Sequence, residues 1–146
     1  MLILVDADAC PVKKEVEKVA RAKGIKVVML IDTSHELKSD YSEIITVSKG
    51  RDSVDLALIN MTSAGDVVIT QDYGVATMAL AKKAYAISQN GLVYDDSNID
   101  QLLFERHISQ KIRRSGGKSG KFKKRTVEDN IKFEKCFEKL INGLKL

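Results

Sequence analysis

Uncharged apolar runs alternate with amphipathic stretches along this chain of 146 residues. Short apolar runs are typical of strands buried on both faces of a parallel sheet, and apolar residues at three- and four-residue spacing are typical of helices with one buried face. The predicted strands are residues 2–5, 27–31, 44–47, 67–70, 85–87 and 92–94. The predicted helices run from Pro11 to Gly24, over 53–61 and 74–83, from a capping signal at Ser97 through Ile112, and from a second signal at Thr126 through Leu144.

This alternation predicts an α/β fold of three layers, in which a mostly parallel sheet is covered by helices on both faces. The polar stretch 32–43 is predicted to be a loop. Residues 1–105 are expected to form the α/β domain, and residues 106–146 to form a basic arm and a C-terminal helix that packs on the same domain or is swapped with it. No apolar run reaches the roughly 20 residues of a membrane span, so no membrane partner is expected. Cys10 and Cys136 lie far apart without metal-like spacing, which predicts free thiols and a cytoplasmic protein.

The ends of the predicted strands carry carboxylates. Asp6 and Asp8 follow the first strand, Asp72 follows the strand at 67–70, and Asp52 and Asp55 open the helix between them. In open α/β sheets, ligands bind outside the carboxyl ends of the strands. Clustered carboxylates cost folding free energy unless a cation lies among them, and Mg²⁺ or Mn²⁺ is the ion usually bound by an all-oxygen site. The pattern therefore predicts a divalent-metal site, which most often serves phosphate chemistry.

Structural roles compete for several of these positions. Asp72 is a suitable helix N-cap, Asp6 could bond its own turn, and Asp52 is a better N-cap than Asp55. Asp95 and the adjacent Asp96 could close the ring of carboxylates, although a loop or cap role fits them better. His35 and His107 have no partner in the sequence and are predicted to be surface residues.

The net charge of +4 conceals an asymmetry. Residues 1–105 carry 11 basic and 16 acidic side chains, whereas residues 106–125, here called the basic segment, carry nine basic and none acidic. Glycines and serines keep such a segment mobile, so its cations can follow a phosphate backbone. The segment therefore predicts a nucleic-acid partner, with Phe122 able to stack on a base. The alternatives are a solvated linker, or an arm that docks on the acidic body of a second subunit in a homo-oligomer. The predicted nucleic-acid-binding residues are Lys111, Arg113, Arg114, Lys118, Lys121, Lys123, Lys124 and Arg125.

Four stretches carry a resemblance to a known family: VDADACPVK (5–13), GDVVITQDYG (65–74), NIDQLL (98–103) and RRSGG (113–117). They resemble the YaiI/YqxD family of small bacterial proteins, over almost the whole chain. That family is in turn similar to PIN-like and NYN-like nuclease domains, which hold one or two Mg²⁺ or Mn²⁺ ions. The resemblance implies a metal-dependent ribonuclease that acts on RNA rather than DNA.

By the same resemblance, Asp6, Asp55 and Asp72 are the catalytic residues. Residues 49–58 look like the Lys-Gly-x-Asp stretch of NYN domains with two residues inserted, which leaves Asp52 and Asp55 as alternative middle ligands. The second aspartate that NYN domains often show after the Asp72 position is absent here. The predicted metal ligands are Asp6, Asp8, Asp52, Asp55 and Asp72.

Three other classes of protein stay open. One is a non-catalytic nucleic-acid-binding protein with a degenerate acidic site, and another is a structural or partner-docking module. The third is an Asp-x-Asp phosphatase like the haloacid dehalogenases, whose first aspartate is a nucleophile. Such enzymes usually continue with Gly-Thr, where this chain has Ala9-Cys10.

Overall fold

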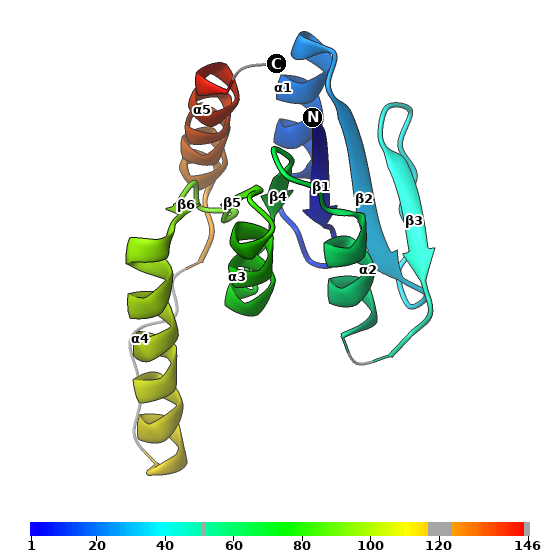
Figure 1. Cartoon of the computed structure of the whole chain (residues 1–146). Coiled ribbons are helices and arrows are strands. Elements are labelled where there is room, and N and C mark those ends of the chain that lie inside the picture. Colours follow the sequence, from blue (N-terminus) through cyan, green and yellow to red (C-terminus); the bar gives the residue numbers. More distant parts are fainter. Residues whose placement is uncertain (51, 117–123, 145–146) are drawn as a thin grey trace.

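The computed structural model describes residues 1–50, 52–116 and 124–144 (Figure 1). A single six-stranded sheet with the order β3-β2-β1-β4-β5-β6 forms the centre. The first five strands pair in parallel, and β6 is antiparallel to β5. The strands are β1 (Leu2–Asp6), β2 (Lys26–Asp32), β3 (Glu43–Val47), β4 (Val67–Ile69), β5 (Tyr85–Ile87) and β6 (Val93–Tyr94).

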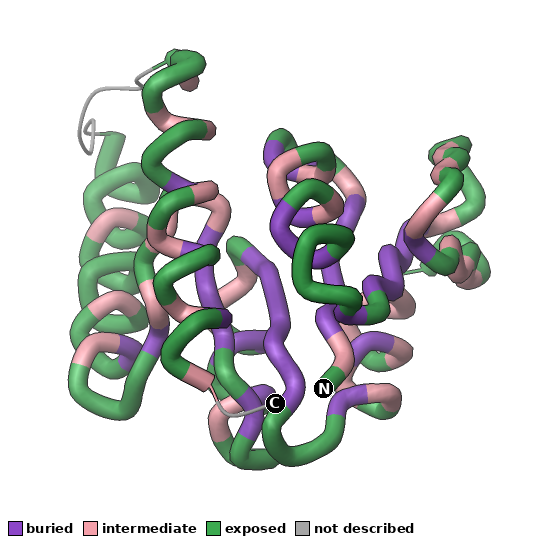
Figure 2. Tube along the Cα trace, turned by 90° about the horizontal axis from the view of Figure 1, so that it is seen from above, coloured by how far each residue is buried: buried purple, intermediate pink, exposed green. Residues whose placement is uncertain are grey.

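Five helices cover the two faces of this sheet, so the predicted three-layer α/β class is confirmed. One face is covered by α1 and α5, and the other by α2, α3 and the start of α4. Figure 2 shows the buried strands lying between helices whose outer sides are exposed. The helices are α1 (Lys13–Lys23), α2 (Ser53–Met61), α3 (Tyr73–Ala81), α4 (Asp96–Arg114) and α5 (Val127–Gly143).

Alternation along β1 explains how both faces obtain a core. Ile3 and Val5 point to the face of α1 and α5, while Leu4 points to the face of α2 and α3. All three side chains are fully buried, which is why this strand is apolar at every interior position. Phe133 and Phe137 of α5 stack on each other in the first core, with ring centroids 5.4 Å apart. The C-terminal helix is therefore part of the same core as β1.

Helix ends agree with the sequence in some places and not in others. Gly24 ends α1 in the left-handed conformation, and Thr126 forms the predicted capping box with Asp129. The N-cap of α4 is Asp95, not Ser97, because the Asp95 carboxylate accepts hydrogen bonds from the backbone N–H groups of Ser97 and Asn98 in the first turn. The cap role expected for Asp95 is thus confirmed. Pro11 was expected at the first helical position, but it lies in a turn two residues before α1 begins.

The basic segment begins as helix, because α4 continues to Arg114. The helix thus extends two residues beyond Ile112, the last position predicted to be helical, and includes Lys111, Arg113 and Arg114. Lys124 and Arg125 directly precede α5. Lys118, Lys121 and Lys123 lie outside the described residues. Among the described helices, none is both long and apolar enough to cross a membrane.

Candidate functional site

The carboxyl edge of the sheet has its natural crevice between β1 and β4. From β1 the chain passes into α1 on one face of the sheet, and from β4, the neighbouring strand, it passes into α3 on the opposite face. Loops that leave adjacent strands toward opposite faces separate, and ligands of doubly wound sheets bind where this happens. Asp6 is the last residue of β1, and Asp72 lies three residues beyond the end of β4. The fold therefore brings two of the predicted site residues to the crevice.

A hydroxyl connects these two strand ends. Thr70 Oγ1 donates to Asp6 Oδ2 at 3.2 Å and accepts from the Asp72 backbone N–H at 3.0 Å. Thr70 is itself buried, and the Tyr94 hydroxyl donates to its carbonyl oxygen at 3.2 Å. The Asp6 carboxylate is thus oriented by a fixed donor. Its second oxygen has no hydrogen-bond partner among the described residues, and so can serve a ligand.

The carboxylates of the crevice repel one another. Burial, the largest cause, and the negative charge of Asp55 raise the pKa of Asp6 from 3.8 to about 6, with smaller contributions from Asp8 and Asp72. Burial also raises the pKa of Asp55, followed by the charges of Asp72 and Asp52. Groups on β1, α2 and the β4–α3 connection therefore sense one another's charge, and a cation among them would relieve the repulsion.

The two middle acids differ in position. Asp55 lies in the first turn of α2 and is half-buried, and its charge acts on Asp6. Asp52 is exposed and holds the N-cap position with a positive φ of 62°, yet its side chain makes no capping hydrogen bond. The predicted cap role of Asp52 therefore applies to the backbone position only. Of the two, Asp55 is the one whose charge raises the pKa of Asp6.

Asp72 combines the cap role with a position in the crevice. Its Oδ1 accepts from the Val75 backbone N–H at 3.0 Å and so caps α3. A Cβ atom on Gly74 would lie 3.0 Å from this oxygen, closer than ordinary contacts allow, so a glycine there leaves room for the carboxylate to fold back. The second oxygen, Oδ2, makes no hydrogen bond within the described part of the chain. Capping and ligand binding are thus compatible.

Asp8 lies in a different cluster, formed with two residues that sequence reasoning missed. His35 Nδ1 is 2.9 Å from Asp8 Oδ1 and 3.2 Å from Asp32 Oδ1. Within the described ranges, these three residues are the one group of potential metal ligands whose atoms all lie within 4.8 Å of one another. His35 is exposed as predicted, but the expectation that it lacks a partner is wrong. Asp32 ends the apolar strand β2 just as Asp6 ends β1, a signal that the sequence did contain.

The carboxylate oxygens of Asp6, Asp55 and Asp72 do not form a group of three within that distance of one another. This spacing still suits Mg²⁺, which keeps several water molecules and usually takes one or two carboxylates directly. The all-oxygen donor set and the mutual repulsion fit such an ion, with the remaining acid acting through water.

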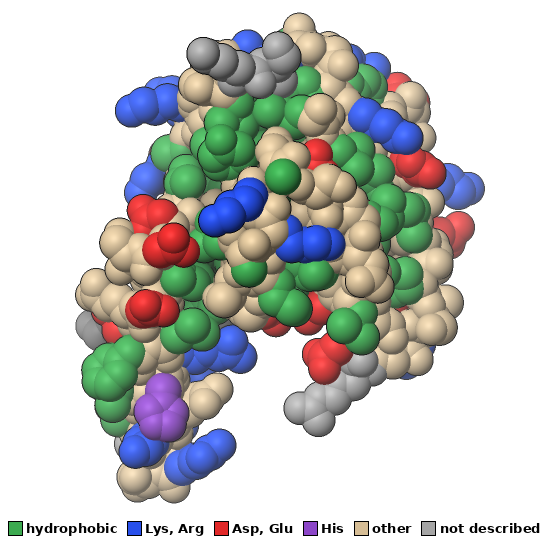
Figure 3. All heavy atoms as spheres, in the orientation of Figure 1, with side chains coloured by type: hydrophobic (Ala, Val, Ile, Leu, Met, Phe, Trp, Pro, Cys, Tyr) green, Lys and Arg blue, Asp and Glu red, His purple; other side chains and the backbone are tan. Residues whose placement is uncertain are grey.

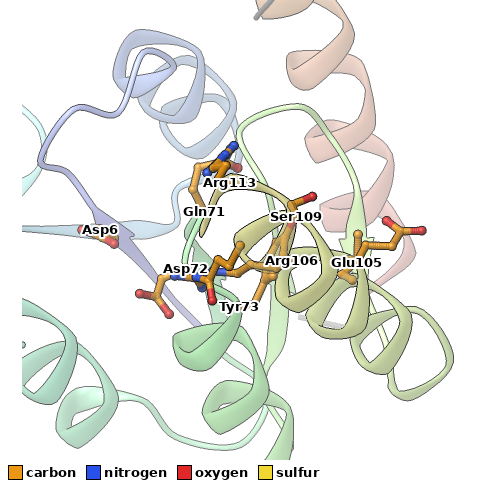
Figure 4. A pocket seen from close by; sticks show the side chains of 10 residues that line it. Asp6, Gln71, Asp72, Tyr73, Glu105, Arg106, Ser109 and Arg113 are labelled. Atoms are coloured by element: carbon orange, nitrogen blue, oxygen red, sulfur yellow. The ribbon is translucent and has the colours of Figure 1, made fainter. Parts of the chain in front are cut away.

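A cavity of about 700 Å³ opens between this crevice and α4. Asp6 and Asp72 line it from the sheet, and Arg106 and Arg113 line it from the helix (Figure 4). Arg106 was not among the predicted site residues, because a position inside a helix gives no sign of which cavity it borders. A smaller cavity of about 270 Å³ lies next to Asp6 and includes Cys10 in its lining. The other residues lining the larger cavity are Gln71, Tyr73, Leu102, Glu105, Ser109 and Gln110.

Arg125, predicted to bind nucleic acid, is held by the protein itself. Its guanidinium donates to Asn130 Oδ1 at 2.6 Å, to Asn90 Oδ1 at 2.7 Å and to the Gln89 carbonyl at 2.7 Å. These bonds tie the start of α5 to the turn between β5 and β6. These bonds give Arg125 a structural role. The nucleic-acid roles of Arg125 and of the other described cations stay predictions.

Fold and site together define an α/β protein with a doubly wound sheet and a carboxylate-lined crevice at its carboxyl edge. The chain belongs to the family described as "Uncharacterized BCR, YaiI/YqxD family", whose model matches residues 4–143.

The chain is similar to several proteins named "UPF0178 protein". It is 62% identical to one from Ruminiclostridium cellulolyticum over 136 residues, which cover 93% of this chain and 89% of that protein. It is 59% identical to one from Alkaliphilus oremlandii over 135 residues, covering 92% and 87%. A third, from Lachnoclostridium phytofermentans, is 54% identical over 147 residues, covering 99% of both chains. No solved structure matches the chain.

Proposed function

We propose that this protein is a divalent-metal-dependent nuclease that acts on RNA. The observation that carries the proposal is the convergence of Asp6 and Asp72 on one cavity, where Thr70 links them. Burial and three other carboxylates raise the pKa of Asp6 there to about 6. Carboxylates from separate elements that are held together against their own repulsion are typical of cation sites and of functional sites generally. The resemblance to PIN-like and NYN-like domains, which have aspartates in the corresponding places, supports the same conclusion.

Asp6 and Asp72 are the proposed direct ligands of Mg²⁺ or Mn²⁺, because each has one oxygen held by the protein and one without a hydrogen bond among the described residues. Asp55 is preferred to Asp52 as the middle acid, since only Asp55 acts on the charge of Asp6. A bound ion would activate water and stabilise the leaving oxygen of a phosphodiester. The chain contributes the orientation: Thr70 fixes Asp6, and the α3 cap fixes Asp72.

Cations near the crevice support nucleic acid as the substrate. Figure 3 shows Lys and Arg side chains along the lower end of α4, the helix that borders the cavity. An acidic crevice repels phosphates until a metal ion neutralises it, so we expect substrate binding to depend both on these cations and on the ion.

The test combines a metal titration with an RNA assay. Calorimetry with Mn²⁺ is expected to show binding by the purified protein that Asp6→Asn and Asp72→Asn weaken. Incubation of single-stranded RNA with protein and Mn²⁺ is expected to give cleavage that EDTA abolishes. Each of the two variants should lower the cleavage rate by about 100-fold or more, because direct metal ligands contribute several kcal/mol to the transition state.

Asp40→Asn is a matched control, because it removes the same charge from an exposed aspartate that pairs with Arg21 on the surface. It should leave metal binding and cleavage unchanged. Salt-sensitive RNA binding without cleavage would instead identify a non-catalytic binding protein. Turnover of small phosphate monoesters alone would identify a phosphatase.

A further inference from the structure

We propose that Arg106 and Arg113 of α4 bind the phosphates of unpaired nucleotides in the 700 Å³ cavity, and so hold a single strand against the carboxylate crevice. This inference rests on the proposed function for its substrate class. It assigns a phosphate-binding site on α4 that is separate from the proposed metal ligands.

The helical repeat places the two arginines on one side of α4. Leu102, Arg106, Ser109 and Arg113 follow one another at steps of four, three and four residues, which are neighbouring positions on one helix face. All four line the cavity. Figure 4 shows this face turned toward Gln71, Asp72 and Tyr73. The arginines thus lie one above the other along a wall that is two helical turns high.

The opposite wall supplies complementary groups. Asp6 and Asp72 stand at the sheet edge, and Tyr73 presents an aromatic ring that packs edge-on against Tyr94, with centroids 6.0 Å apart. Phosphate oxygens suit the planar fork of an arginine, and base faces suit an aromatic ring. A ligand that satisfies both walls carries one or two phosphates and at least one base.

The remaining charge of the cavity is consistent with this ligand. Glu105, the third acid in the lining, accepts a hydrogen bond from Gln101 Nε2 at 3.1 Å, on its own helix. Arg106 and Arg113 are the cationic residues of this lining, while the crevice acids require a divalent ion before an anion can approach.

Cavity size selects the form of the nucleic acid. A volume of about 700 Å³ lies within the roughly 300–1,000 Å³ of small-molecule pockets, which corresponds to one or two nucleotides. A base can stack on the Tyr73 ring in this lining only when it is not held within a base-paired stack. Unpaired nucleotides are therefore the expected ligand class.

The test measures binding of a fluorescent single-stranded RNA of about ten nucleotides by anisotropy, with Mg²⁺, at several salt concentrations. A gel run after each titration verifies that the RNA is intact. For single strands, the slope of log K against log salt changes by about 0.7 for each phosphate contact. Arg106→Gln and Arg113→Gln are each expected to reduce the slope by about this amount, whereas Arg106→Lys, which keeps the charge, should retain it. Lys135→Gln, an exposed cation of α5, is the control with the same charge change and should leave the slope unaltered.

Weaker binding of a duplex of the same sequence, together with the reduced slope, supports the inference. An Arg106→Gln slope equal to that of the native protein overturns it, as does duplex binding that equals single-strand binding. Thermal unfolding of each variant separates loss of fold from loss of contact. Absence of cleavage with Mn²⁺ would defeat the nuclease proposal, but it would leave the Arg106 slope as an independent result.

Discussion

The Thr70 hydroxyl donates a hydrogen bond to Asp6 Oδ2 at 3.2 Å, and so joins two strand ends that are 64 residues apart in the sequence. Thr70 Oγ1 also accepts a hydrogen bond from the backbone N–H of Asp72 at 3.0 Å. One side chain therefore sets the orientation of one proposed metal ligand and the backbone of the other. This contact also lowers the pKa of Asp6, against the larger effect of burial.

Replacing Thr70 by valine keeps the shape of the side chain but removes this donor. Because the hydrogen bond favours the charged carboxylate, Thr70→Val should raise the pKa of Asp6 further above 6. A proton then competes better with the metal, and we expect Mn²⁺ affinity at pH 6 to fall by about tenfold, the usual weight of a hydrogen bond to a charged group. Calorimetry at pH 6 and pH 8 measures the effect, which should shrink at the higher pH. Thr70→Ser retains the hydroxyl and should bind as the native protein does; equal weakening by both variants would contradict this role.

The raised pKa of Asp6 also predicts how the metal-free protein responds to pH. The unfolded chain loses this proton near pH 4, whereas the native protein keeps it until about pH 6. The native state is therefore favoured at low pH, and its stability falls as pH rises from 4 through 6, by about 1–3 kcal/mol. Asp6→Asn lacks this loss, so in EDTA it should be more stable than the native protein at pH 8, with the advantage disappearing toward pH 4. Urea unfolding across this range tests it, and identical pH profiles for the two proteins would refute it.

Two helix ends give a stability prediction with opposite signs. Lys83 follows α3 with φ of 66°, and the N–H groups of Lys83 and Ala84 bond back to the carbonyls of Leu80 and Ala79, which is the Schellman arrangement. A left-handed backbone costs a side-chain-bearing residue about 1–2 kcal/mol relative to glycine. Lys83→Gly should therefore raise the free energy of unfolding by about 1 kcal/mol.

Gly24 is the matched case, since it ends α1 with φ of 68° and an added Cβ would meet no atom within 4 Å. Gly24→Ala should lower the free energy of unfolding by about 1 kcal/mol through the backbone alone. Thermal and urea unfolding of both variants check the pair. Shifts of the same sign in the two variants would show that another effect dominates.

Arg125 is expected to matter for stability and not for nucleic-acid binding. Its three hydrogen bonds to Gln89, Asn90 and Asn130 tie α5 to the β5–β6 turn. Arg125→Gln should lower the free energy of unfolding by about 1–3 kcal/mol, while Lys124→Gln, at an exposed position, should change it by less than about 0.5 kcal/mol. Urea unfolding measures the change in stability of both variants. The salt dependence of RNA binding by Arg125→Gln tests the expectation that Arg125 does not contribute to nucleic-acid binding. A reduced salt slope with unchanged stability in Arg125→Gln would reverse this assignment.

The apolar runs were sufficient to predict the sheet and most of the helices. Ile3, Leu4 and Val5 are buried because β1 lies between two layers, and such a strand must be apolar throughout. Local capping chemistry was less decisive. Asp95 and Ser97 are both good N-cap residues, and the choice of Asp95 depends on where β6 ends and the helix can start.

Some features of the candidate site follow from the sequence alone, and others depend on the tertiary structure. The sequence alone determined that Asp6 and Asp72 follow buried strands, because the character of a strand depends on neighbouring residues. Tertiary structure decided which groups meet: His35 with Asp8, Thr70 with Asp6, and Arg106 with the cavity at the sheet edge. These contacts depend on strand order and on the helix face that turns inward. Such contacts join residues far apart in the chain, so their relation exists only once the whole sheet has formed.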